Sequence, residues 1–245
     1  MSTMVYIGID DTDNLETRGT GFRARQLVDR LHEHGVARAL GVTRHQLLVD
    51  ERIPYTSHNS SACLAVDSST EADTLLAFCR EFLLEIAAQG SDVGLCLADE
   101  NQAGAAAQFG RTAQTRIVSQ DEARGFAQHH GIRLEGLTGD HQGIIGALSA
   151  VGLHADGNDG RYIWLRGLRD QAHRLITLEQ LRERTNIDRV ALRDGRELTD
   201  PAAKIDLGPW PRTVRIDKQA VLLVEKTSDN NYKVLEKDAI KSVRP

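Results

Sequence analysis

Lysine is absent from the chain before Lys204, although lysine and arginine together number 30. A Walker A loop requires a lysine, so no such phosphate-binding loop exists before that residue. Phosphate charge in this part of the chain has to be met by a metal ion, arginine, histidine or backbone N–H groups. Residues 1–159 hold 12 arginines against 22 acidic residues, whereas residues 160–245 hold 18 basic against 13 acidic residues.

Cysteine pairs and long apolar runs are also lacking. The three cysteines, Cys63, Cys79 and Cys96, lie far apart in apolar stretches, which predicts buried free thiols and excludes a zinc ribbon. No stretch approaches the roughly 20 apolar residues of a membrane span, and the N-terminus has no signal-peptide pattern. We therefore expect a cytoplasmic protein without a membrane partner.

The alternation of elements predicts an α/β (α+β) fold in which helices flank a mixed sheet. We expect residues 1–186 to form the core, as one body or two subdomains, and residues 187–245 a small β-rich C-terminal domain. Helices are predicted at 22–34, 72–86, 101–117, 119–131 and 140–152, and strands at 5–9, within 36–50, and at 62–66, 92–98 and 161–166.

Two of these helices follow a capping-box sequence, Ser68 with Glu71 and Ser119 with Glu122. In such a box the serine and glutamate side chains bind the free N–H groups at the start of the helix. The sequence therefore predicts well-defined N-termini for both helices.

The most informative motif is Asp10-Asp11-Thr12-Asp13, at the end of the predicted strand 5–9. Three carboxylates in four residues repel one another unless a cation lies among them. Magnesium prefers carboxylate and phosphate oxygens, so Asp10, Asp11 and Asp13 are candidate metal ligands. An ordinary acidic turn stays open as an alternative, and a calcium loop is disfavoured because the sharp-turn glycine of an EF-hand is missing.

Thr20 follows this motif, between Gly19 and Gly21 and at the start of a predicted helix. Helix N-termini attract phosphate through unpaired N–H groups and the helix dipole. Acids for a metal, glycines for close backbone approach and a helix start for anions together indicate a phosphoryl-transfer site. The candidate catalytic residues are Asp11, Asp13 and Thr20, and the candidate nucleotide- or phosphate-binding residues are Thr12, Arg18, Gly19, Gly21, Asn59, Ser60 and Ser61.

Two further segments carry polar or glycine-rich patterns. The loop 52–61 offers positive charge from Arg52 and His58, and hydroxyl and amide groups from Thr56, Ser57, Asn59, Ser60 and Ser61. An ordinary surface loop is the alternative. Gly143 and Gly146 weaken the helix 140–152 unless close packing or a ligand requires them.

Together these segments resemble the archaeal tRNA-isoleucine agmatinylcytidine synthetase family, in its N-terminal kinase-like and ferredoxin-like domains. GIDDTDN resembles the strand-and-acids motif of the family, and GDHQGIIGALSAVGL resembles its GRGLIGALAAIG-like helix. IPYTSHNSSA stands in the place of an IPYKTRGNGA-like loop, SDVG resembles a TNPG-like turn, and RYIWLR follows as the next strand. The order of motifs is preserved from residue 4 to about residue 166.

The resemblance implies a domain that binds ATP with magnesium and activates an acceptor by phosphorylation. It places Asp10, Asp11 and Asp13 at the metal and Thr20 at the phosphate-transfer site. The chain departs from the family in the second loop, where the lysine and arginine of the family fall on Thr56 and His58. Arg18, Arg23 or Arg44 could replace the missing lysine.

We therefore expect an ATP- and magnesium-dependent phosphotransferase or ATPase whose acceptor is a small molecule or a nucleoside. A tRNA acceptor is disfavoured but stays open, because the N-terminal part is acidic and we expect no counterpart of the tRNA-holding domains of the family. The alternative is a non-catalytic nucleotide- or RNA-binding module on the same scaffold.

Overall fold

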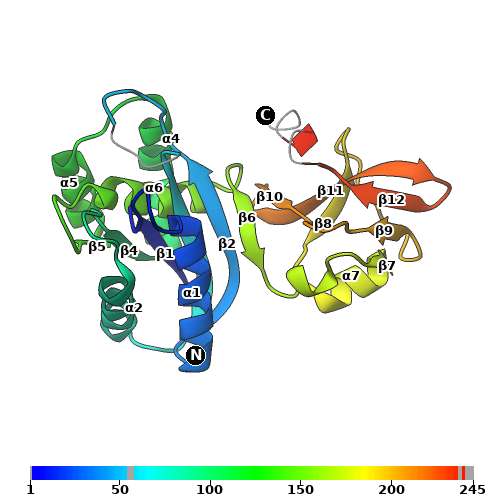
Figure 1. The fold of residues 1–245 in the computed structure, drawn as a ribbon, viewed down its shortest axis with the longest axis horizontal. Coiled ribbons are helices and arrows are strands. Elements are labelled where there is room, and N and C mark those ends of the chain that lie inside the picture. Colours follow the sequence, from blue (N-terminus) through cyan, green and yellow to red (C-terminus); the bar gives the residue numbers. More distant parts are fainter. Residues whose placement is uncertain (1, 54–57, 237–238, 241–245) are drawn as a thin grey trace. The chain divides into compact units, whose positions relative to one another are not determined.

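The computed structural model describes residues 2–53, 58–236 and 239–240. The chain forms two compact units, Met1–Asp156 and Gly157–Pro245 (Figure 1). This division comes earlier than the expected boundary at residue 186. The reason is packing: Leu165 and Leu181 belong to the same hydrophobic cluster as Leu222, so the segment before residue 186 contributes to the C-terminal core.

The N-terminal unit is built on an antiparallel sheet with the strand order β5–β4–β1–β3–β2 (Figure 1). The strands are β1 (Thr3–Asp10), β2 (Arg38–Gln46), β3 (Ser60–Ser68), β4 (Gly94–Asp99) and β5 (Arg133–Gly136). The central strand β1 carries the alternating pattern of the sequence, and Ile7 pairs with Leu64 on one side and Leu97 on the other. Its central position keeps the acid motif on a rigid element.

Helices cover both faces of this sheet. The helices α1 (Thr20–Glu33) and α2 (Ala72–Ile86) pack on one face. On the other, α6 (Gly143–Asp156) lies directly on β1, β3 and β4, and contacts α3 (Glu100–Ala105), α4 (Ala107–Thr115) and α5 (Gln120–His130). Tyr6 packs in the same core cluster as Leu148 of α6. Since side chains alternate along a strand, Ile7 and Ile9 face the opposite layer.

The C-terminal unit is a second sheet-based body with the order β6–β10–β11–β12–β9–β7, in which β8 pairs with β11. Parallel pairing joins β8 to β11 and β9 to β12. Its elements are β6 (Arg161–Leu165), β7 (Leu175–Thr177), α7 (Leu178–Arg184), β8 (Arg189–Leu192), β9 (Lys204–Asp206), β10 (Thr213–Ile216), β11 (Gln219–Ser228) and β12 (Asn231–Val234). The predicted α+β class with mixed strand directions is confirmed.

Several local predictions are confirmed. Cys63, Cys79 and Cys96 are buried free thiols. Ser119 and Glu122 form the predicted capping box of α5, and Gly131 ends that helix with a φ of 64°. No helix of the described residues is long and apolar enough to span a bilayer.

Other local predictions were wrong. Ser68 is the last residue of β3, and its hydroxyl donates to the carbonyl of Val36 (2.9 Å) and accepts from the N–H of Thr70 (3.1 Å). It therefore does not cap α2, whose N-terminus has no side-chain cap. The helix expected over 101–117 is divided at Ala106. The helix expected from residue 140 begins only at Gly143, because His141 has a left-handed φ of 64°.

Candidate functional site

The acid motif lies where β1 leaves the sheet. Asp10 is the last residue of β1 and pairs with Gly94 of β4. Asp11 has a φ of 52°, a left-handed conformation that is uncommon outside glycine. The chain turns there, so consecutive carboxylates stand at the end of the central strand instead of continuing along it.

Thr20 lies at the centre of a hydrogen-bonded cluster that joins this turn to α1. Its backbone N–H and its Oγ1 both donate to Oδ1 of Asp13, at 2.9 and 3.0 Å. The Oγ1 of Thr20 in turn accepts from Oγ1 of Thr12 (3.2 Å) and from the N–H of Thr12 (3.4 Å). This geometry gives the single proton of the Thr20 hydroxyl a defined direction, toward the Asp13 carboxylate.

The N-terminus of α1, where the sequence predicts phosphate binding, is capped by a side chain of the protein itself. Gly19 is the N-cap residue and has no side chain to cap the helix, so Asp13 takes that place. The sequence predicted phosphate at this helix N-terminus, but a carboxylate of the chain already binds the N–H of Thr20. Gly21 lies inside the first turn of α1, and a Cβ at Gly19 would make only an ordinary contact of 3.8 Å with Asp13.

Electrostatics at the site disfavour the bare carboxylates. Burial, followed by the charge of Asp11, raises the pKa of Asp10 to about 7. Burial, followed by the charges of Asp92 and Asp13, raises the pKa of Asp11 to about 6. The ionised forms of both carboxyl groups are thus disfavoured, and a bound cation would favour them.

Asp10, Asp11 and Asp13 could supply only part of the ligands of a bound magnesium ion. Among the residues placed by the structure, no group of three or more His, Cys, Asp or Glu side chains could hold a metal ion. Asp10, Asp11 and Asp13 therefore do not form a complete cage, since one oxygen of Asp13 is engaged by Thr20. Magnesium uses one or two protein carboxylates and completes its shell with water and phosphate.

The acids open into a cavity of about 190 Å³. The side chains predicted from sequence that line it are Asp10, Asp11, Asp13, Thr20, Asn59 and Ser60. Its other polar lining comes from Arg52, His58, Arg116 and Gln142. The structure thus brings residues of four separate segments to the end of β1.

Other predicted site residues lie outside this lining. Thr12 is fully buried, and its hydroxyl donates to Oγ1 of Thr20, so it positions the Thr20 side chain without lining the cavity. Arg18 stacks over the ring of Phe22, with the guanidinium carbon 4.5 Å from the centroid. Ser61 is buried in β3 and, within the described residues, its Oγ has no hydrogen-bond partner. Thr56 and Ser57 of the second loop lie outside the described residues.

Arg44 supplies positive charge that acts on the acids. Burial lowers the pKa of Arg44, while the charges of Asp10 and Asp13 oppose that shift. The Nε of Arg44 donates to Oγ of Ser60 at 2.8 Å. Asn59 donates through Nδ2 to the carbonyl of Leu48 at 2.7 Å, which ties the second loop to the chain after β2.

The glycines of α6 are explained by close packing against the acid motif. A Cβ on Gly146 would lie 1.7 Å from Oδ2 of Asp10, and one on Gly143 would lie 2.4 Å from the carbonyl oxygen of Asp92. On the sheet side, a Cβ on Gly8 would lie 2.0 Å from the carbonyl oxygen of Ala147. The helix backbone therefore rests on the strand that carries Asp10 and forms one wall of the cavity.

Arg116 was not identified from the sequence. It lies in the link between α4 and α5, more than ninety residues after the acid motif, and no motif marks it. The substitutes suggested for the missing lysine, Arg18, Arg23 and Arg44, do not line the cavity, whereas Arg52 and Arg116 do. Only the tertiary fold brings Arg116 to this place.

The fold and the acid motif together define a scaffold similar to that of a nucleotide-binding, tRNA-modifying synthetase. The particular likeness is to solved structures of TiaS, the tRNAIle2 agmatidine synthetase. Apo TiaS aligns with a TM-score of 0.54 and 25% identity, over 61% of this chain and 35% of that one. The family resemblance seen in the sequence is confirmed at this level.

Two ligand complexes of the same synthetase give similar values. The complex of TiaS with its tRNA and ATP aligns with a TM-score of 0.55 and 27% identity, and the complex with tRNA, AMPCPP and agmatine with 0.54 and 26%. Each alignment covers 61% of this chain and 36% of the synthetase chain, so the match spans about a third of that protein. No protein-family model matches the chain. No curated protein sequence matches it either.

Proposed function

We propose that the N-terminal unit binds ATP with magnesium and acts on its terminal phosphoryl group, as a phosphotransferase or an ATPase. The observation that carries this proposal is the hydrogen bond of 3.0 Å from the Thr20 hydroxyl to Asp13, in a cavity also lined by Asp10 and Asp11. Likeness to a synthetase structure solved with ATP supports the choice of nucleotide.

One or two of the carboxylates of Asp10, Asp11 and Asp13 would hold the metal. Magnesium bound there would neutralise phosphate charge and polarise the oxygen that bears it. The raised pKa values of Asp10 and Asp11 support a cation-dependent site, since both carboxylates are disfavoured as free anions. The phosphate oxygens of the nucleotide would complete the coordination shell that these acids leave open.

Thr20 would contact the terminal phosphate. The Thr20 oxygen would attack the terminal phosphorus of ATP and ADP would leave, after which the acceptor or water would take the phosphoryl group from Thr20. Asp13 would accept the proton of the Thr20 hydroxyl, and Thr12, which donates to the same oxygen, would hold that oxygen in place. Positive charge at the cavity would come from the arginines that line it, in place of a lysine.

The acceptor in this proposal is a small molecule or a nucleoside. The N-terminal unit is acidic and has no lysine, which disfavours a large polyanion at its surface. A cavity of about 190 Å³ also suits a compact group better than a folded nucleic acid.

The test is incubation of the pure protein with ATP and magnesium, followed by separation of ADP, AMP, phosphate and pyrophosphate. We expect slow formation of ADP that increases with the correct acceptor and is lost with EDTA. Asp11→Asn should abolish it. The matched control is Asp121→Asn, which removes an exposed carboxylate on α5 away from this cavity. The same ADP formation in Asp11→Asn and wild type would contradict the proposal.

A second candidate function, nucleic-acid binding, is favoured by a feature of the C-terminal unit. Both tryptophans of the chain, Trp164 and Trp210, line one pocket of about 80 Å³ together with Arg169. The Arg169 guanidinium carbon lies 3.8 Å from the ring centroid of Trp210, which is 50% exposed. Aromatic rings beside arginine are the surfaces on which single-stranded bases stack.

The surrounding charge also favours this second function. Within the described residues, Arg166, Arg174 and Arg212 take part in no ion pair, in contrast to most arginines of the N-terminal unit. The N–H of His173 donates to the carbonyl of Gly208 at 2.7 Å, so the segment that holds Arg174 lies beside the one that leads to Trp210. Arg166 and Arg212 are also close in sequence to Trp164 and Trp210, so basic residues are concentrated in the segments that carry the two rings.

Tryptophan fluorescence tests this second function directly, because both tryptophans lie in the pocket. Titration with a short oligouridylate should quench the emission, and the effect should weaken with salt. Arg169→Ala should reduce affinity, whereas Arg196→Ala, which removes an exposed arginine paired with Asp194, should leave it unchanged. An emission spectrum that does not respond to the oligonucleotide would exclude this site.

A further inference from the structure

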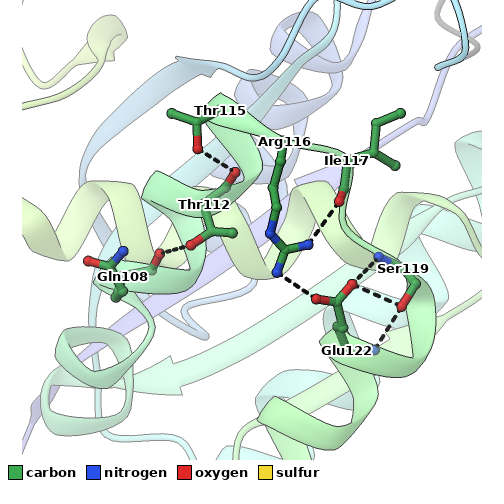
Figure 2. Close-up of polar contacts among 7 residues, drawn as sticks. All are labelled: Gln108, Thr112, Thr115, Arg116, Ile117, Ser119 and Glu122. Atoms are coloured by element: carbon green, nitrogen blue, oxygen red, sulfur yellow. Dashed lines mark hydrogen bonds and ion pairs between the residues drawn. The ribbon is translucent and has the colours of Figure 1, made fainter.

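Arg116 lies at a junction that gives its side chain two possible partners. It is the C-cap residue of α4, and its extended backbone carries the chain toward α5. Its N–H donates to the carbonyl of Thr112 at 3.0 Å. The hydroxyls of Thr112 and Thr115 donate to carbonyls of the same helix (Figure 2). The backbone of Arg116 is therefore anchored, while its side chain is 54% exposed.

The guanidinium is held by one acceptor from the α4–α5 link and one from the first turn of α5. One nitrogen donates to Oε1 of Glu122 at 2.6 Å and the other to the carbonyl of Ile117 at 2.9 Å (Figure 2). Glu122 itself is fixed, because its Oε2 accepts from the N–H of Ser119 at 2.8 Å as part of the capping box of α5. Of the two charged partners, only Arg116 is free to move without breaking a helix cap.

The ion pair between Arg116 and Glu122 is weak enough to be exchanged. Both side chains are about half exposed, at 54% and 44%, and exposed pairs contribute at most about 1 kcal/mol. An arginine that binds a phosphate forms stronger, charge-assisted and often paired hydrogen bonds. A phosphate in the cavity would therefore compete successfully with Glu122 for the same guanidinium.

Arg116 already borders the cavity that holds Asp10, Asp13 and Thr20. We propose that Arg116 is a phosphate-binding residue of this cavity, held by Glu122 in the free protein and transferred to a phosphate oxygen of the bound nucleotide. The inference rests on the proposed nucleotide function and adds the cation that replaces the missing lysine. Glu122 then acts as a competitor for Arg116 and sets how readily the nucleotide enters.

This arrangement makes two substitutions act in opposite directions. Arg116→Ala removes the phosphate ligand and should weaken binding of Mg²⁺–ATP about tenfold or more. Glu122→Gln removes the competing charge, yet glutamine at this position still completes a capping box. It should therefore tighten Mg²⁺–ATP binding by a few-fold without destabilising α5. If the ion pair had only a structural role, Arg116→Ala and Glu122→Gln would not change the affinity for Mg²⁺–ATP in opposite directions.

Isothermal titration of Mg²⁺–ATP into wild type, Arg116→Ala, Arg116→Lys and Glu122→Gln measures these changes, with circular dichroism to verify the fold. Arg116→Lys should recover part of the lost affinity. The matched control is Arg124→Ala, because Arg124 is exposed on α5, hydrogen-bonded to Gln120 and His141, and absent from the cavity lining. Its affinity should equal that of wild type.

The outcomes separate this inference from the function on which it rests. If Arg116→Ala binds Mg²⁺–ATP as tightly as wild type does, the role of Arg116 is refuted, but the proposed nucleotide function is not. Weaker binding in Glu122→Gln would overturn the competition between Glu122 and phosphate. Wild type that binds neither Mg²⁺–ATP nor magnesium tripolyphosphate would overturn both the inference and the proposed function.

Discussion

Gly146 of α6 lies directly against Asp10 of β1, so that a single methyl group on its Cα would lie 1.7 Å from Oδ2 of the carboxylate. The helix can reach the strand only where no side chain stands between them. This contact connects the packing of the core to the position of the first acid of the site. A change at Gly146 therefore tests the fold and the site together.

We expect Gly146→Ala to destabilise the protein by about 1–3 kcal/mol, because Asp10 or α6 has to shift. Binding of Mg²⁺–ATP should weaken as well, since Asp10 is displaced. Gly104→Ala is the control: it adds the same methyl group in α3, where nothing lies within 4 Å of the new Cβ. Denaturant unfolding and thermal-shift titration measure both effects. Equal stability of Gly146→Ala and Gly104→Ala would show that Asp10 and α6 can move apart with little loss of free energy of unfolding.

In the absence of a bound cation, the stability that Asp10 contributes should fall as the pH rises. Folding raises the pKa of Asp10 from its ordinary 3.8 to about 7. The contribution of Asp10 to stability is therefore full below about pH 4 and is lost as the pH rises through about 7. In EDTA, Asp10→Asn should be close to wild type at about pH 4 and more stable than wild type at about pH 8. Thermal unfolding at both pH values checks this.

Magnesium with ATP provides the complementary measurement for Asp10. At about pH 8, the ligands should stabilise wild type more than Asp10→Asn, because the cation compensates the buried charge only where a charge exists. A stability difference between the two proteins that is the same at every pH, with and without ligands, would refute the electrostatic account of this site.

Thr20→Val should abolish ATP turnover and preserve the fold. Valine has nearly the same shape as threonine, but it cannot donate to Asp13 or accept from Thr12. The loss of these hydrogen bonds should cost about 1–3 kcal/mol of stability. Thr20→Ser, which keeps the hydroxyl, should retain part of the activity. Turnover is measured as ADP formation, and mass spectrometry of the incubated wild type would reveal a phosphate on Thr20.

The sequence predicts the parts of this site that depend on local order. The alternation of Val5, Ile7 and Ile9 with Tyr6 and Gly8 predicts β1, and the acids that follow must stand at its end. The capping box of α5 is equally local, because Ser119 and Glu122 are three residues apart. These features need no knowledge of the tertiary fold.

Other features depend on contacts between distant segments. Ser68 has the spacing of a helix cap, but its hydroxyl binds Val36, which the sheet brings beside it. Asp13 accepts from the N–H of Thr20, seven residues later, and so caps α1 across the turn. Arg116 reaches the cavity through the packing of α4 on α6, a contact that no spacing in the sequence encodes.

The last prediction separates a small acceptor from a folded tRNA. Tight binding of tRNA needs many phosphate contacts from lysine and arginine, and such binding weakens steeply with salt. The N-terminal unit has no lysine, and most of its arginines are paired with acids, for example Arg80 with Glu135 and Arg38 with Asp67. We therefore expect weak and non-specific binding of bulk tRNA at about 150 mM salt.

Filter binding of bulk tRNA measures this, with tryptophan fluorescence followed in the same samples. Sub-micromolar binding together with quenching of the Trp164 and Trp210 emission would contradict the small-acceptor proposal and favour the C-terminal unit as a nucleic-acid site. Arg169→Ala shows which of the two sites binds tRNA, because it alters a residue of the tryptophan pocket and leaves the acids of the N-terminal cavity intact. If that variant loses tRNA binding but keeps ATP turnover, the two units bind their ligands independently, tRNA at the tryptophan pocket and ATP at the acids of the N-terminal unit.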